Sequence, residues 1–262
     1  MTTTLIRRAG VLALIATTTA GLSGCAGVIG AKMTYDDTEK GKITDIVLAG
    51  GGGDVTVTTA PVTETTIRRV VRQASNPGTP YQLQGTTLTL DTICGMHCSV
   101  SYEIKTPPGV KVHGRLGSGD IRLDSVADTD LELTSGDLTV TNATGPVQVR
   151  ATSGDIHVND AKSSVKVQST SGDIEALNAA GPVDVRVTSG DVQVSLAAPN
   201  SVTAHATSGD VTVNVPGDGK YKLVTSHGSG DLSIQGLEND SSAKNVIDVR
   251  TGSGDVNVTS VS

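Results

Sequence analysis

The sequence predicts an all-β fold, a parallel β-solenoid of the β-helix-like type, with two-strand coils of about 18 residues and an N-terminal β cap. Three observations predict it. The tripeptide Ser-Gly-Asp recurs at a nearly constant step. Alternating apolar residues flank each copy and change parity across it. Valine and threonine, which favour strands, are abundant, and glycine supplies 31 of the 262 residues.

The beginning of the chain is typical of a bacterial lipoprotein signal peptide. Two arginines precede a mostly apolar run, residues 11–22, which is too short to remain as a membrane-spanning helix. The segment Leu22-Ser23-Gly24-Cys25 resembles a lipobox, where such a leader is cut and the cysteine receives a diacylglyceryl group. We therefore expect a leader at residues 1–24, lipid attachment at Cys25 and a flexible tether at residues 25–42. An ordinary secretory signal is the alternative.

The remaining cysteines form an even pair. With Cys25 lipidated, Cys94 and Cys98 are left in an oxidising compartment, where a disulfide is expected. Alternating residues on both sides predict a hairpin whose neck this bridge would close. The alternative is a soft-metal site, because Met96 and His97 lie between the two thiols. That spacing matches no common structural zinc pattern, so we expect a disulfide and no metal.

Residues 43–115 are predicted to form the N-terminal β cap. Ile46 and Leu48 lead into a four-glycine corner that ends in Asp54, a variant of the later repeat. Residues 63–72 fit either a helical face or an irregular strand. A cap is expected at this end because an unpaired terminal strand invites aggregation.

Residues 116–262 are predicted to be the solenoid. The expected structural turns contain Asp120, Asp137, Asp155, Asp173, Asp191, Asp210, Asp231 and Asp255, at spacings of 17, 18, 18, 18, 19, 21 and 24 residues. So regular a period indicates stacked coils. The two longer late steps indicate loops at the opposite corner, which are either interaction sites or tolerated insertions. Because the chain ends soon after Val258, the last coil is expected to leave an open edge.

The parity of the apolar residues locates the corners. Val147 and Val149 precede one tripeptide at odd positions, whereas Ile156 and Val158 follow it at even positions. One strand cannot bury both pairs on the same face, so the chain must turn within Ser-Gly-Asp. Glycine permits the backbone angle and the polar side chains can bind nearby amides. A second corner is expected near residues 142–146 and in the matching positions of other coils.

Stacking would bring the corner aspartates into a column. Neighbours about 4.8 Å apart repel by about 0.9 kcal/mol in water, so something must offset the repulsion. Calcium does so in Gly-rich nonapeptide β-rolls, but here only one corner is acidic. We therefore expect hydroxyls and backbone amides to hold each carboxylate.

The outward-facing rows point to no catalytic chemistry. One row is expected to run from Arg122 to Asn257 on one face, and another from Glu132 through Gln148 to Thr203 on the other. These rows mix charges and sizes and converge on no acid–base pair. We expect no catalytic residue and no cofactor.

Composition argues against one class of partner. The net charge is −7 and only 2% of residues are aromatic. A nucleic-acid binder needs clustered cations for phosphates or aromatic side chains on which bases stack. We therefore expect no nucleic-acid partner.

The repeated Ser-Gly-Asp-[Ile/Val]-x-[Leu/Val] unit resembles a bacterial family of domains of unknown function named "putative adhesin". The strand at residues 100–104, which leads through Pro108-Gly109-Val110 into the first unit, resembles it too. The resemblance covers about residues 43–262. It implies a β-solenoid, frequently at the bacterial envelope, and some relatives sit near envelope-stress systems. It carries over no catalytic residue, because the shared motif is structural.

Together these features predict a non-catalytic, lipid-anchored β-solenoid on the extracytoplasmic face of the bacterial cell membrane. Its partners are expected to be the membrane, through the lipid anchor, and an envelope or external protein or glycan. Two alternatives remain open. One is an envelope-stress or signalling accessory protein that binds a membrane partner, and the other is a calcium-dependent binding module.

Overall fold

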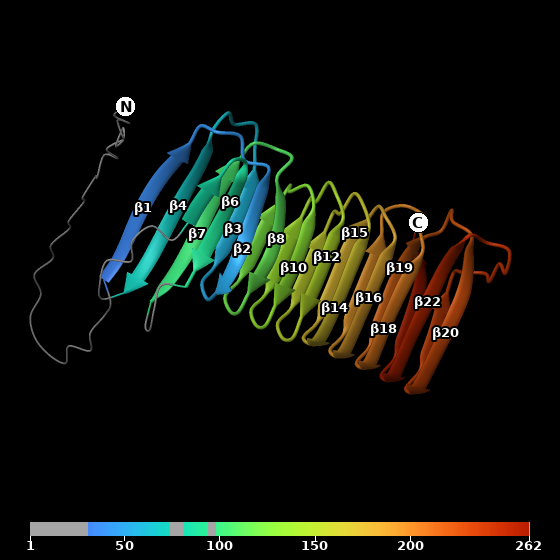
Figure 1. The fold of residues 1–262 in the computed structure, drawn as a ribbon. Helices are drawn as coiled ribbons and strands as arrows, with labels where there is room; N and C mark the ends of the chain where they lie inside the picture. The colour runs from blue at the N-terminus through green and yellow to red at the C-terminus, as the bar shows by residue number, and fades with distance from the viewer. Residues whose placement is uncertain (1–30, 74–80, 94–97, 262) are drawn as a thin grey trace, which may run out of the picture.

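The computed structural model describes residues 31–73, 81–93 and 98–261. Within these ranges the protein contains no helix and folds into two long, facing sheets that form one elongated stack (Figure 1). Sheet A has twelve strands and sheet B has eleven, and neighbouring strands run parallel except in three antiparallel pairs near the N-terminal end. The predicted fold class, an all-β parallel solenoid, is confirmed. No helix in the described part of the chain has the length and apolar character needed to cross a membrane.

The strands alternate between the sheets along the chain. Sheet A contains, in spatial order, β1 (Ala31–Glu39), β4 (Thr65–Gln73), β7 (Ser99–Thr106), β3 (Val55–Thr59), β9 (Ile121–Asp124), β11 (Leu138–Thr141), β13 (Ile156–Asn159), β15 (Ile174–Ala179), β17 (Val192–Leu196), β19 (Val211–Pro216), β23 (Val256–Val261) and β21 (Leu232–Gln235). Sheet B contains β20 (Tyr221–Ser229), β22 (Asn245–Ser253), β18 (Val202–Ser208), β16 (Val183–Ser189), β14 (Val165–Ser171), β12 (Val147–Ala151), β10 (Thr129–Leu133), β8 (Lys111–Leu116), β2 (Asp45–Gly51), β6 (Thr87–Thr92) and β5 (Tyr81–Gln84).

Each regular coil consists of one strand in sheet B, a Ser-Gly-Asp corner and one strand in sheet A. In β12, Val147 and Val149 point inward, and after the corner Ile156 and Val158 of β13 do the same, all at most 1% exposed. Directly paired strands repeat this pattern, so Val147 lies beside Val165. Aliphatic rows from the two sheets meet to form a continuous core, which is why the chain needs almost no aromatic residues.

The second corner lies opposite the first, where the sequence places it. Ser125, Asn142, Asp160 and Asn178 adopt a left-handed backbone there, with φ between 55° and 59°. The side chains stack from coil to coil, because Asn142 Nδ2 donates to Asp124 Oδ1 at 3.3 Å and Asn178 Nδ2 donates to Asp160 Oδ1. Asn and Asp tolerate this backbone conformation better than most residues do.

The N-terminal end differs from the sequence-based expectations in two ways. Residues 31–39, expected within a flexible tether, form β1, which pairs antiparallel with β4. The predicted hairpin around Cys98 is wrong, because β6 lies in sheet B and β7 lies in sheet A. The two strands pair with other strands and not with each other. The ambiguous residues 63–72 contribute to β4, a strand, because their apolar side chains pack between the sheets.

Coils at both ends are stacked out of chain order. The coil formed by β2 and β3 lies between the β6–β7 coil and the β8–β9 coil. At the other end β22 pairs with both β18 and β20, and β23 pairs with both β19 and β21. The last coil in sequence is therefore inserted into the stack, and the expected open edge belongs to β20 and β21 (Figure 1). The two long late connections, residues 217–220 and 236–244, carry the chain across the extra coil.

Candidate functional site

The corner aspartates form one hydrogen-bonded column along the solenoid. In each, the backbone N–H donates to Oδ1 of the aspartate one coil away, at 2.8–3.2 Å. All eight aspartates of the tripeptides take part, in the order Asp120, Asp137, Asp155, Asp173, Asp191, Asp210, Asp255 and Asp231. Asp54 begins the column, because its Oδ1 accepts from the N–H of Asp120. The column thus places one backbone donor on Oδ1 of every carboxylate from Asp54 to Asp255, and Asp231 ends it as a donor only.

The glycine before each aspartate is required by both conformation and space. Gly154 has φ +110°, and a Cβ atom there would overlap the backbone oxygen of Gly136 in the coil below. Gly172 repeats this against Gly154. The tripeptide is thus explained by close stacking of the backbone, and its recurrence is no evidence of catalysis.

The outward face of sheet A carries one mixed row. Its members are Thr56, Arg122, Thr139, His157, Glu175, Gln193, Thr212, Asn257 and Ser233, each beside the next. His157 Nδ1 lies 2.9 Å from Glu175 Oε2, and this contact is the closest approach to an acid–base pair in the row. No group of three or more His, Cys, Asp or Glu in the described ranges is arranged to hold a metal ion.

The row expected to run from Glu132 through Gln148 on the outward face of sheet B is wrong at its first residue. Gln148 stands beside Asp130, whereas Glu132 stands beside Arg150 in the neighbouring row. Glu132 lies between Arg115 and Arg150, with nitrogen–oxygen distances of 3.5 and 4.0 Å. A shallow hollow of about 490 Å³ opens beside these three side chains.

Farther along the same face, Asp248 forms an ion pair with Arg250 and lies beside His205. Its Oδ1 lies 2.7 Å from Arg250 Nε and 3.2 Å from His205 Nε2. Partial burial acts to raise the pKa of Asp248, but hydrogen bonds from Arg250 and His205 outweigh it, and the net shift is downward. These contacts place the Asp248 carboxylate between two basic side chains on the surface of sheet B.

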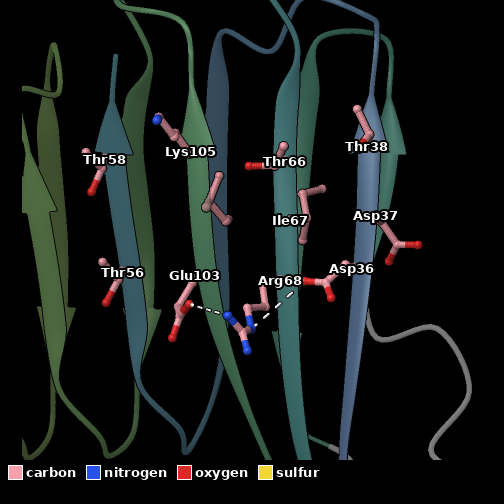
Figure 2. A pocket seen from close by; sticks show the side chains of 11 residues that line it. Asp36, Asp37, Thr38, Thr56, Thr58, Thr66, Ile67, Arg68, Glu103 and Lys105 are labelled. Carbon is pink, nitrogen blue, oxygen red and sulfur yellow. Dashed lines mark ion pairs between the residues drawn. The ribbon is translucent and has the colours of Figure 1, made fainter. Parts of the chain in front are cut away.

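A hollow lies on the outer face of the cap, where β1, β4, β7 and β3 meet (Figure 2). It encloses about 600 Å³. Arg68 lies across it and makes long ion pairs of 3.9 Å with Asp36 on one side and Glu103 on the other. A row of Thr38, Thr66, Lys105 and Thr58 borders it. The hollow is open to solvent, and threonines and charged side chains surround an apolar floor that includes Ile67 and Ile104.

The interior of the cap contains a buried cation that the sequence analysis missed. Arg69 is only 4% exposed, and its guanidinium carbon lies 4.5 Å from the ring centre of Tyr35 and 5.7 Å from that of Tyr81. Asp37 lies 3.9 Å away. Burial, and the nearby charge of Asp37, raise the pKa of Tyr81 to about 12. The sequence contained one signal of this arrangement. Three of the four tyrosines fall in residues 35–102, which indicates that the core of the cap differs from the aliphatic core of the repeats.

Two expected cysteine sites fall at or beyond the limits of the described structure. Cys25, the expected lipid-attachment residue, lies outside the described residues. Cys98 is disulfide-bonded, and Cys94 lies outside them. The Cys94–Cys98 pairing therefore stays a prediction.

Stacked parallel coils with one repeated corner define the molecule as a β-solenoid. More particularly, the chain belongs to the Toastrack DUF4097 family, whose match covers residues 43–259. No curated protein matches it significantly.

Several solved structures resemble the chain. A "putative adhesin" from Bacteroides fragilis has a TM-score of 0.56 and 15% identity, over 90% of this chain and 100% of that one. A "putative adhesin" from Parabacteroides distasonis has a TM-score of 0.40 and 14% identity, over 88% and 98%. At this identity the first likeness shows a shared fold.

Proposed function

We propose that the protein is a non-catalytic, adhesin-like β-solenoid, held by a lipid on Cys25 at the extracytoplasmic face of the bacterial membrane. The observation that carries this proposal is the contrast between constant and variable positions. The inward rows and the Asp column repeat from coil to coil, while the outward rows change at every step. A scaffold of this kind displays a varied polar surface and needs no reaction centre.

The place of the anchor supports display at a surface. Cys25 lies six residues before the start of β1, and β1 lies at one end of the stack (Figure 1). A lipid at Cys25 would hold the cap close to the membrane, with the repeats extending from it. Since the chain is acidic overall, it gains little attraction from anionic lipid, and acyl chains would supply the anchoring.

Two experiments test the proposal. The first compares the wild-type chain with Cys25→Ala in membrane and soluble fractions of the cell. We expect the wild type in the membrane fraction and the variant released from it, and retention of the variant would contradict lipid anchoring.

The second experiment exposes the purified chain from residue 26 to whole cells, wall fractions and solubilised membrane proteins. Capture of a surface protein or glycan supports an adhesin-like role, whereas capture of a membrane protein alone favours the signalling alternative.

Calcium dependence is tested separately. In the Asp column a backbone N–H already donates to Oδ1 of the neighbouring carboxylate, which supports folding without a bound ion. We therefore expect the melting temperature to be the same with millimolar calcium and with a chelator. A clear upward shift with calcium would favour the calcium-dependent module instead.

A further inference from the structure

The end of the solenoid formed by β20 and β21 leaves the core open. Leu232 and Ile234 of β21 point along the inward rows, yet they are 39% and 38% exposed. Their neighbours in β23, Val256 and Val258, are fully buried. The difference arises because no further coil covers the last one in the described structure.

The strand edge at this end is only partly closed. Asp240 N–H donates to the carbonyl of Tyr221 at 3.0 Å, and Leu223 N–H donates to Asn239 Oδ1 at 2.9 Å, so the loop after β21 covers the beginning of β20. Val256 N–H donates to the carbonyl of Asp231. Because backbone groups alternate in direction along a strand, those of Leu232 and Ile234 then face away from the stack. The open region is therefore β21 and the second half of β20.

Two devices that often protect a sheet edge, charged side chains and proline, are lacking in β21. β21 contains no charged residue and no proline. By contrast β1, the edge strand of the same sheet at the opposite end, contains Lys32, Asp36, Asp37 and Glu39. Charged edges discourage strand addition, and uncharged ones permit it. The C-terminal end is thus the one suited to pair with another strand.

The charge of this end is compatible with a second copy of the chain as its occupant. Residues 217–244, which form the end coil and its loops, contain three lysines and four acidic residues, in a chain of net charge −7. Two copies of this end can approach without the repulsion expected between the acidic bodies. A strongly charged partner would gain little from so balanced a surface.

We propose that this end binds the same end of a second copy of the chain. A twofold axis would bring β21 of one copy antiparallel to β21 of the other, and β20 to β20, so that both sheets continue across the junction. Leu232 and Ile234 of the two copies would then close a shared core. A four-residue strand and half of a nine-residue strand give a small interface, so the dimer is weak and concentration-dependent.

The consequence for adhesion rests on the proposed function. If Cys25 anchors the cap, the open end lies at the far tip of the solenoid, and pairing joins molecules on opposing membranes. Many weak pairs acting together would hold two cells, although one pair would not.

Analytical ultracentrifugation of the chain from residue 26, which contains every described strand, tests the pairing directly. We expect a monomer at micromolar concentration and a growing dimer fraction toward millimolar concentration. The double variant Leu232→Lys, Ile234→Lys should stay monomeric, while Thr212→Lys, on the outward row two strands from the edge, should dimerise like wild type. A wild type that stays monomeric throughout, or a dimer that survives the double substitution, would overturn the proposal.

A cross-linking variant tests the same pairing even if the double lysine variant fails to fold. Ser233 lies at the middle of β21 and would approach its counterpart across the twofold axis. Under mild oxidation Ser233→Cys should form a covalent dimer, and Thr212→Cys should not. Equal cross-linking of both variants would contradict pairing through this edge. These results do not depend on Cys25, so the anchor and the tip pairing can fail independently.

Discussion

The backbone N–H of Asp173 donates to Oδ1 of Asp155 at 2.9 Å, and the N–H of Asp155 donates in the same way to Asp137 at 2.9 Å. Each corner is thereby placed against the corner of the adjacent coil by one repeated contact. Because strands follow directly on both sides of the corner, this contact also sets the register in which the apolar rows stack.

Removal of one carboxylate from the column should lower the stability of the fold, because one backbone N–H loses its hydrogen-bond acceptor. Asp155→Ala leaves the N–H of Asp173 without its partner, and we expect the free energy of unfolding to fall by about 1 kcal/mol. Asp155→Asn keeps an oxygen at the same place and removes one negative charge, so it should be close to neutral. Urea unfolding followed by circular dichroism measures both. An alanine variant as stable as the asparagine variant would show that the column does not hold the coils.

Gly172 should tolerate no branched side chain. Its φ is +107°, and a Cβ atom would overlap the carbonyl of Gly154. We expect Gly172→Val to lower the free energy of unfolding by about 3 kcal/mol or more, from backbone strain and overpacking together. Gly41→Val is the matched control, because no heavy atom lies within 4 Å of the added Cβ. Equal melting temperatures for the two variants would contradict the close stacking at the corner.

The tyrosines of the cap should make the protein sensitive to alkali. Burial and the charge of Asp37 raise the pKa of Tyr81 from 10.0 to about 12 in the folded state. A raised pKa means that folding favours the neutral phenol, so its contribution is complete below pH 10 and is lost as the pH rises toward about 12. The measured quantity is the free energy of unfolding across this window. The free energy of unfolding of Tyr81→Phe should decline less than that of wild type. An identical decline in both proteins would show that Tyr81 does not cause it.

The inserted position of the last coil predicts that the end coil can be removed. β22 and β23 already pair with β18 and β19. Deletion of residues 218–243 would reduce the separation of Asp210 and Asp255 from 45 residues to 19, the separation of Asp191 and Asp210. We expect this shortened chain to fold with the strand signature of wild type in circular dichroism.

A deletion of equal length inside the stack is the control. Removing residues 156–181 takes out β13, β14 and β15 and would place β12 directly before β16, two strands of the same sheet. That variant should not fold. If both deletions behaved alike, the order of coils at the C-terminal end would be wrong.

The repeated part of the fold could be predicted because its signals are local. The parity change between Val149 and Ile156, with Gly154 between them, is sufficient to locate a corner without knowledge of the rest of the chain. The order of coils at the ends could not be predicted. β20 and β22 have similar patterns, and either would fit beside β18.

The cap was harder to predict for a different reason. Strand β1 alternates, but its inward positions include Asp37, and Arg69 of β4 also points into the core. These charges obscure the apolar periodicity that identifies a buried strand. Only the three-dimensional arrangement shows that Arg69 lies against Asp37, Tyr35 and Tyr81.

The central claim, that coils stack directly on one another in a defined order, is tested most directly by distances between spin labels on the outward row of sheet A. With one label at residue 122, a second at 193, 257 or 233 should lie at roughly 19, 29 and 34 Å, because each coil adds about 4.8 Å. The position late in the sequence, 257, should thus lie closer than 233. Distances that rise instead with sequence number, or that bear no relation to the coil step, would contradict the account.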